Sequence, residues 1–115
     1  MLSEELLQQR WSQLKIKMAS RLGNDPCLDD ILVFIGITEA MLPPKQFTEK
    51  EKADLRQMAI CTVLVPARYY QLLWVDATGW PHYNELQRVP EMNADERERF
   101  LMQYVLLYAE KNKLV

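Results

Sequence analysis

Residues 25–37 read DPCLDDILVFIGI and join a helix start to an apolar run. The acid that opens this stretch is a capping residue, and Pro26 after it suits the first helical position. Residues 31–37 are apolar on nearly all sides, and a helix with so little polar surface is usually covered by its neighbours. A buried strand is the competing interpretation, but the start signal and the distance to Pro43-Pro44 favour a helix. Gly36 indicates close contact with another helix.

Three further segments carry apolar residues at the spacing of an amphipathic helix. One runs from about Ser3 to Leu22, ahead of a glycine that suits a helix end. Another opens with a capping box at Thr48 and extends to about Leu64, and the last opens in the same way at Asn93. The residues expected to face the core are Leu7, Trp11, Leu14, Met18 and Leu22 in the first segment, Leu55, Met58, Ala59, Thr62 and Val63 in the second, and Phe100, Leu101, Tyr104, Val105 and Tyr108 in the third.

The stretch between the last two helices has a different character, because aromatic and apolar residues crowd it. Residues 69–75 read YYQLLWV, and residues 76–79 place Asp and Gly where a type I turn favours them. We therefore predict a short β-hairpin or an ordered loop, in which Pro81 lies on an edge strand. A short helix over residues 67–75 is the alternative.

These elements predict a mainly α protein. Its four helices are expected to form a compact bundle, as a single domain over residues 1–115, with a small hairpin or ordered loop between helices three and four. The chain has 115 residues, of which 49% are hydrophobic. That length is enough to bury a core without disulfides or a metal.

The ends, the apolar runs and the cysteines predict a cytoplasmic location. The chain opens with Ser3-Glu4-Glu5 rather than with a basic segment and an apolar run, so no secretory signal is predicted. The longest apolar run is too short to cross a bilayer, so no membrane partner is expected. Cys27 and Cys61 are expected to be free, buried thiols, and a disulfide between them is the alternative.

Most familiar site chemistry is missing from the sequence. The three glycines lie far apart, so they form no phosphate-binding loop. One histidine and two distant cysteines do not make a zinc site of the usual kind. Glu39 lies more than two helical turns from Asp29 and Asp30, so these acids are no obvious catalytic pair. We therefore predict no catalytic residue, no metal and no cofactor.

An aromatic group is the most unusual feature of the sequence. Tyr and Trp dominate binding hot spots, because they bury a large area at low entropic cost. The predicted function is therefore a non-enzymatic module that binds a protein partner or itself. The candidate binding residues are Trp80, His82, Tyr83, Tyr70 and Trp74. The simpler interpretation is that these aromatics pack the hairpin onto the helices.

His82, the only histidine, carries the alternative function of a small enzyme or ligand-binding protein. It could act as an acid or base in a pocket, helped by Asp76, Tyr83 or Glu85. The simpler interpretation is a loop histidine that helps to fix the turn. Nucleic-acid binding is a third alternative, against which the net charge of −2 and the scattered basic residues count.

Three segments resemble a family of short bacterial conserved-hypothetical helical proteins. They are residues 28–36 (LDDILVFIG), residues 58–64 (MAICTVL) and residues 76–83 (DATGWPHY), and the Gly-Trp-Pro-His step is the most specific of them. The resemblance covers the central two-thirds of the chain. It implies a helical bacterial cytosolic protein, and it implies no activity, catalytic residue or cofactor.

Overall fold

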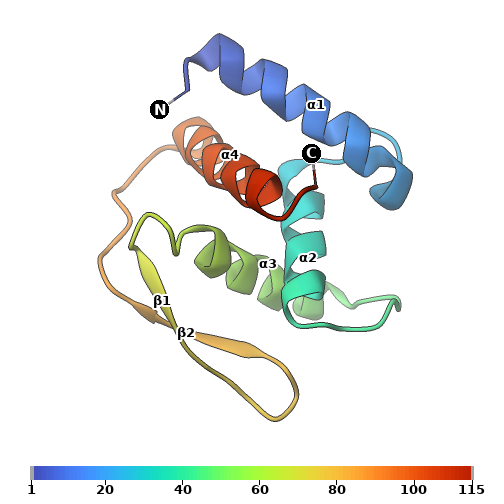
Figure 1. The fold of residues 1–115 in the computed structure, drawn as a ribbon, viewed down its shortest axis with the longest axis vertical. Coiled ribbons are helices and arrows are strands. Elements are labelled where there is room, and N and C mark those ends of the chain that lie inside the picture. Colours follow the sequence, from blue (N-terminus) through green and yellow to red (C-terminus); the bar gives the residue numbers. More distant parts are fainter. Residues whose placement is uncertain (1, 115) are drawn as a thin grey trace. The chain divides into compact units, whose positions relative to one another are not determined.

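The computed structural model describes residues 2–114 and confirms a mainly α chain with a hairpin between the third and fourth helices (Figure 1). The chain forms two compact units, one from residues up to Ile31 together with Glu91 onward, and one from Leu32–Pro90. The elements are α1 (Glu4–Leu22), α2 (Leu28–Glu39), α3 (Glu49–Val63), β1 (Tyr70–Val75), β2 (Pro81–Glu85) and α4 (Ala94–Lys111).

The first unit pairs α1 with α4. Glu4 Oε2 lies 3.6 Å from Arg99 Nε near the start of both helices, and Arg10 Nη1 lies 3.1 Å from Glu110 Oε1 further along both. The two helices therefore run in the same direction (Figure 1). Ser3 caps α1 by accepting a hydrogen bond from the third helical amide, as capping serines do. Four residues of the predicted stripe are buried, whereas Leu22 at the end of the helix is only half-buried. The buried residues are Leu7, Trp11, Leu14 and Met18.

Helix α4 begins with the predicted capping box, in which Asn93 and Glu96 exchange side chain-to-backbone hydrogen bonds. Its buried face differs from the predicted one. Phe100, Tyr104 and Tyr108 are only half-buried. From Phe100 onward apolar residues follow one another on most sides of this helix, so spacing alone did not identify the covered stripe. The residues that are buried are Leu101, Met102, Val105, Leu106 and Ala109.

Helix α2 starts in the first unit and continues into the second, and none of residues 31–37 is exposed. The helix starts at Leu28, and the predicted start at Pro26 was wrong. The backbone of Asp25 is left-handed, with φ of +51°, whereas a capping residue is extended. Cys27 occupies the cap position instead, and its N–H donates to Asp30 Oδ2 at 3.0 Å.

The predicted close helix contact at Gly36 is confirmed. A Cβ atom at this position would lie 2.6 Å from the backbone oxygen of Leu55 on α3. Helix α3 starts with the predicted capping box of Thr48 and Glu51. One cluster of buried residues in the second unit is formed by Ala40, Leu55 and Met58. Partly buried residues packed against this cluster are Val33, Ile37, Leu42, Phe47, Trp80 and Tyr83.

Strands β1 and β2 form an antiparallel two-stranded sheet, so the alternative of a helix over residues 67–75 was wrong. The Gly79 amide donates to the Asp76 carbonyl at 2.9 Å, which closes a four-residue turn at the predicted position. Gly79 then adopts φ of +92°, as in a three-residue hairpin loop that ends in a bulge. A second irregularity leaves Leu73 without a partner, between the pairs Leu72–Tyr83 and Trp74–His82.

Both cysteines are free thiols, as predicted. Cys61 is partly buried on α3. Cys27 is exposed, so the prediction that it is buried was wrong: it lies just before the first residue of α2, where its side chain is not covered. Within residues 2–114, no helix combines the length and the apolar character that a membrane crossing requires.

Candidate functional site

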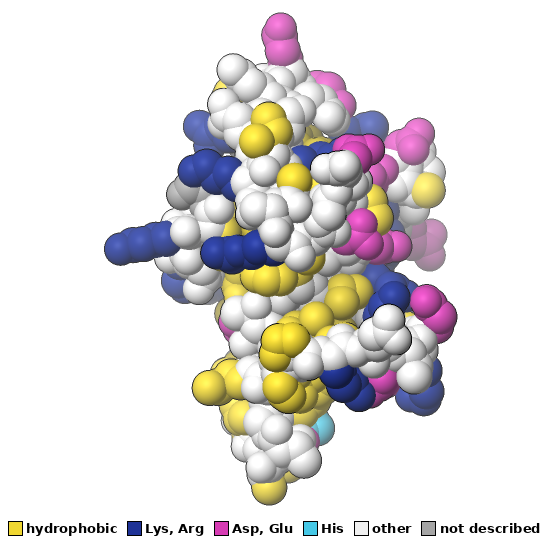
Figure 2. Space-filling model, turned by 90° about the vertical axis from the view of Figure 1, so that its right-hand side faces the viewer, with side chains coloured by type: hydrophobic (Ala, Val, Ile, Leu, Met, Phe, Trp, Pro, Cys, Tyr) yellow, Lys and Arg dark blue, Asp and Glu magenta, His cyan; other side chains and the backbone are white. Residues whose placement is uncertain are grey.

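Strand β1 holds a row of exposed apolar side chains. Leu72, Leu73, Trp74 and Val75 are between 47% and 59% exposed. Figure 2 shows hydrophobic side chains gathered over the hairpin, beside the single histidine. Exposed apolar residues are ordinary when scattered, but these four follow one another, and the strand pairing puts Val75 and Trp74 on opposite faces, so both faces of this end of the strand are apolar. We call these four residues the β1 patch.

The indole of Trp74 stacks on the imidazole of His82. These residues face each other across the hairpin, their ring centroids lie 4.6 Å apart and their planes differ by 10°. His82 Nε2 lies 2.8 Å from Asp76 Oδ2. The strand pairing therefore holds Trp74 against a ring that is itself fixed at its far edge.

Asp76 organises the turn that joins the strands. Its Oδ1 accepts hydrogen bonds from the Thr78 hydroxyl at 2.6 Å, the Thr78 amide at 2.9 Å and the Trp80 amide at 3.1 Å. The Thr78 hydroxyl, followed by His82, lowers the pKa of Asp76 well below its ordinary value, because both stabilise the ionised carboxylate. The turn thus keeps a carboxylate charged next to the imidazole.

Trp80 and Tyr83 have a different environment from Trp74. Both pack against the cluster formed by Ala40, Leu55 and Met58, and both are half-buried. The Tyr83 hydroxyl lies 2.7 Å from Thr62 Oγ1, and Thr62 donates its one proton to the Met58 carbonyl at 3.0 Å. Tyr83 is therefore the donor to Thr62. Burial raises the pKa of Tyr83, which keeps its hydroxyl protonated for this role.

The predicted binding residues are thus divided between two environments. Trp74 and His82 stack on the exposed side of the hairpin, whereas Trp80 and Tyr83 lie against the core. Tyr70 starts β1 opposite Glu85 and is half-buried. The leucines and the valine of the β1 patch were not among the predicted binding residues. The uncharged composition of residues 69–75 was the signal that pointed to them.

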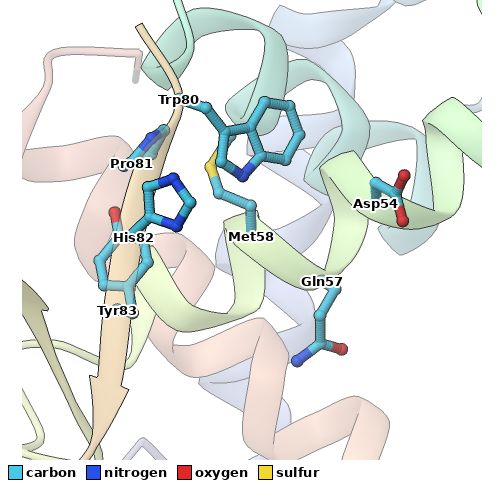
Figure 3. A pocket seen from close by; sticks show the side chains of 7 residues that line it. All are labelled: Asp54, Gln57, Met58, Trp80, Pro81, His82 and Tyr83. Carbon is cyan, nitrogen blue, oxygen red and sulfur yellow. The ribbon is translucent and has the colours of Figure 1, made fainter. Parts of the chain in front are cut away.

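A shallow, open pocket of about 480 Å³ lies between α3 and the start of β2. Figure 3 shows the Trp80 side chain beside Met58, with His82 on the neighbouring strand. Among the residues predicted to assist His82, Asp76 lies within hydrogen-bond distance of its ring. Glu85 instead lies opposite Tyr70 in the strand pairing. A carboxylate–imidazole pair can act as a general base when the imidazole accepts a proton from a hydroxyl group. The Thr78 hydroxyl, however, donates its hydrogen bond to Asp76 and not to His82. The residues that line the pocket are Asp54, Gln57, Met58, Trp80, Pro81, His82 and Tyr83.

The described part of the chain brings no three His, Cys, Asp or Glu side chains together in a group that could hold a metal ion. Comparison of the chain with protein-family models, with curated proteins and with solved structures gives no match. The properties of the hairpin itself are therefore the basis for assigning a function.

Proposed function

We propose that this protein is a non-enzymatic protein-interaction module and that the β1 patch is its contact surface. One observation carries the proposal. Four consecutive apolar side chains remain about half exposed on a strand that pairs on one side only. Edge strands are usually protected by charges or prolines, and a large exposed apolar patch marks an interaction surface.

The anchoring of Trp74 supports the same function. A tryptophan contributes most to binding when its ring is already held in the bound orientation, because less conformational entropy is then lost. Trp74 stacks on His82, and His82 bonds to Asp76, which accepts three further hydrogen bonds from the turn. The partly buried Trp80 and Tyr83 fix the hairpin to α3 and so position the patch.

A cytoplasmic location is part of the proposal. Two free thiols, one of them exposed, fit a reducing compartment better than an oxidising one.

Affinity capture from native lysate tests the function. We compare the wild type with Trp74→Ala and with a control, Leu107→Ala, which removes a side chain of similar exposure (51%) from α4. A protein that is identified by mass spectrometry, retained by wild type and control and lost with Trp74→Ala supports the proposal. Capture that is equal for all three proteins contradicts it.

Trp80→Ala distinguishes a residue that contacts the partner from one that holds the hairpin in place. Trp80 is packed against the core, so this substitution is expected to lower the melting temperature as well as binding. Trp74→Ala is expected to lower binding with little change in melting temperature, because exposed positions contribute little to stability.

A second candidate, ligand binding beside His82, has one specific observation in its favour. The pocket places a hydrogen-bonded imidazole next to Trp80 and Met58 (Figure 3). A small molecule that raises the melting temperature of the wild type but not of His82→Ala would favour this candidate over the interaction module.

A further inference from the structure

The sheet has two outer edges, and they differ in their capacity to accept another strand. The Asp76 amide donates to the Trp80 carbonyl at 3.0 Å, and the Trp80 amide donates to the Asp76 side chain, so this pair makes one of the two hydrogen bonds of a hydrogen-bonded pair. In an antiparallel ladder such pairs alternate with pairs whose backbone groups point outward. The next pair, Val75 and Pro81, therefore directs its backbone groups away from the ladder.

Pro81 has no N–H, so its place on the outer edge of β2 leaves that edge without a donor there. Val75 presents both an N–H and a carbonyl on the outer edge of β1. Residues 71–75 are all exposed, so nothing in the described chain covers this edge. The edge of β1 is therefore the one open to pairing.

Charge distinguishes the two strands further. Residues 69–75 contain no charged side chain, whereas β2 ends in Glu85. Two copies of β1 can therefore lie side by side in any register without opposing like charges. Their side chains also match, because each copy offers the same row of leucine, tryptophan and valine.

We infer that β1 pairs antiparallel with β1 of a second copy of this chain, which gives a four-stranded sheet in the order β2-β1-β1-β2. The inference rests on the proposed function and specifies the partner. In a dimer with a two-fold axis, the open β1 edges of both copies pair with each other. Two-fold dimers are also the commonest oligomers. The edges that remain are those of β2, which carry Pro81, so the assembly does not continue into a fibre.

The irregularity at Leu73 defines the register. Tyr70 and Val75 lie opposite Glu85 and Pro81, hence on one face of the sheet. Gln71 and Trp74 lie opposite Asn84 and His82, hence on the other face. A two-fold axis normal to the sheet brings together residues of the same face. Tyr70 therefore lies opposite Val75 of the second copy, Gln71 lies opposite Trp74, and Leu72 and Leu73 meet at the axis.

Sedimentation analysis over a wide concentration range tests the dimer. Leu73→Lys is expected to weaken the dimer by at least about tenfold, because it sets two like charges close to the axis. Leu107→Lys is the matched control on α4 and is expected to leave the dimer unchanged. Circular dichroism and melting temperature confirm that each variant is folded.

Cysteine crosslinking tests the register in a Cys27→Ser background, which removes the exposed thiol. Tyr70→Cys and Val75→Cys, which both keep Trp74, are mixed and oxidised. The mixture is expected to form a disulfide-linked dimer faster than either variant alone, because the two positions face each other only across the interface.

Each outcome has one meaning. The inference is supported if Leu73→Lys weakens the dimer, the control variant does not, and the cysteine pair crosslinks as expected. A monomer at every concentration that still captures another protein through Trp74 overturns the inference and leaves the proposed function standing. A dimer that Leu73→Lys leaves intact overturns the inference. A monomer whose capture does not depend on Trp74 overturns both.

Discussion

The ring of His82 stacks on the ring of Trp74 across the hairpin, with centroids 4.6 Å apart. The stack gives the β1 patch a fixed aromatic centre, although most of this strand is exposed. Its stability depends on the turn, because Asp76 holds the far edge of the imidazole.

Asp76→Asn should destabilise the protein most at neutral pH. The pKa of Asp76 is below its ordinary value of 3.8 in the folded state, so the charged form is favoured by folding. This stabilisation is complete above pH 3.8 and is lost as the pH falls toward the lower folded value. The difference in unfolding free energy between wild type and Asp76→Asn should therefore shrink below pH 3.8, as measured by denaturant titration across a pH series.

Asp54→Asn serves as the control for this series, because its carboxylate pairs with Lys50 on the exposed surface of α3. A difference between wild type and Asp76→Asn that stays constant into the acid range would show that the turn does not depend on the charge.

Gly36→Ala should lower stability, although alanine is the better helix former by about 1 kcal/mol. The new methyl group would meet the backbone oxygen of Leu55 at 2.6 Å, and a backbone atom cannot move aside cheaply. Overpacking of this kind costs about 1–3 kcal/mol, so we expect a net loss in denaturant unfolding. A gain in stability would mean that α2 and α3 are not in close contact at this point.

Tyr83→Phe should cost about 0.5–1.5 kcal/mol, the net value of a typical hydrogen bond. The lost bond is the one from the Tyr83 hydroxyl to Thr62 Oγ1. A double-mutant cycle with Thr62→Val isolates the contribution of the pair from the bond that Thr62 makes to Met58. Additive effects of the two substitutions would contradict a direct bond.

Met41→Gly should stabilise the protein. Met41 ends α2 in a left-handed conformation, with φ of +53°, and an L-residue there costs roughly 1–2 kcal/mol. Its side chain is 86% exposed, so little packing is lost. Met41→Ala keeps the unfavourable backbone and should give no gain. Equal melting temperatures for Met41→Gly and Met41→Ala would contradict this explanation.

Local signals predicted much of the fold. The capping boxes at Thr48 and Asn93 and the Asp-to-Gly spacing of the turn are short-range features, and each is present in the structure. The predicted start of α2 was wrong because Asp25 and Pro26 have the residue types of a helix start, whereas the helix itself begins at Leu28. A single bundle of four helices and a single domain stay predictions.

Less of the candidate site than of the fold could be predicted from the sequence. Residues 69–75 lack the alternation of apolar and polar residues that marks a half-buried strand, so the sequence did not say which side chains face out. The facing of Trp74 is decided by the unpaired Leu73, and spacing along one strand does not reveal such an irregularity. The environments of Trp74 and Trp80 therefore emerge only when the two strands are paired.

Amide hydrogen exchange of β1 tests most directly whether its open edge is an interface. Mass spectrometry compares the peptide that covers residues 71–75 in dilute and in concentrated protein, with the α4 peptide around Leu107 as the internal control. Protection of β1 that rises with concentration, is absent in Leu73→Lys and leaves α4 unchanged is the predicted result. Exchange at β1 that is the same at every concentration and is also unaffected by any captured partner would contradict the account.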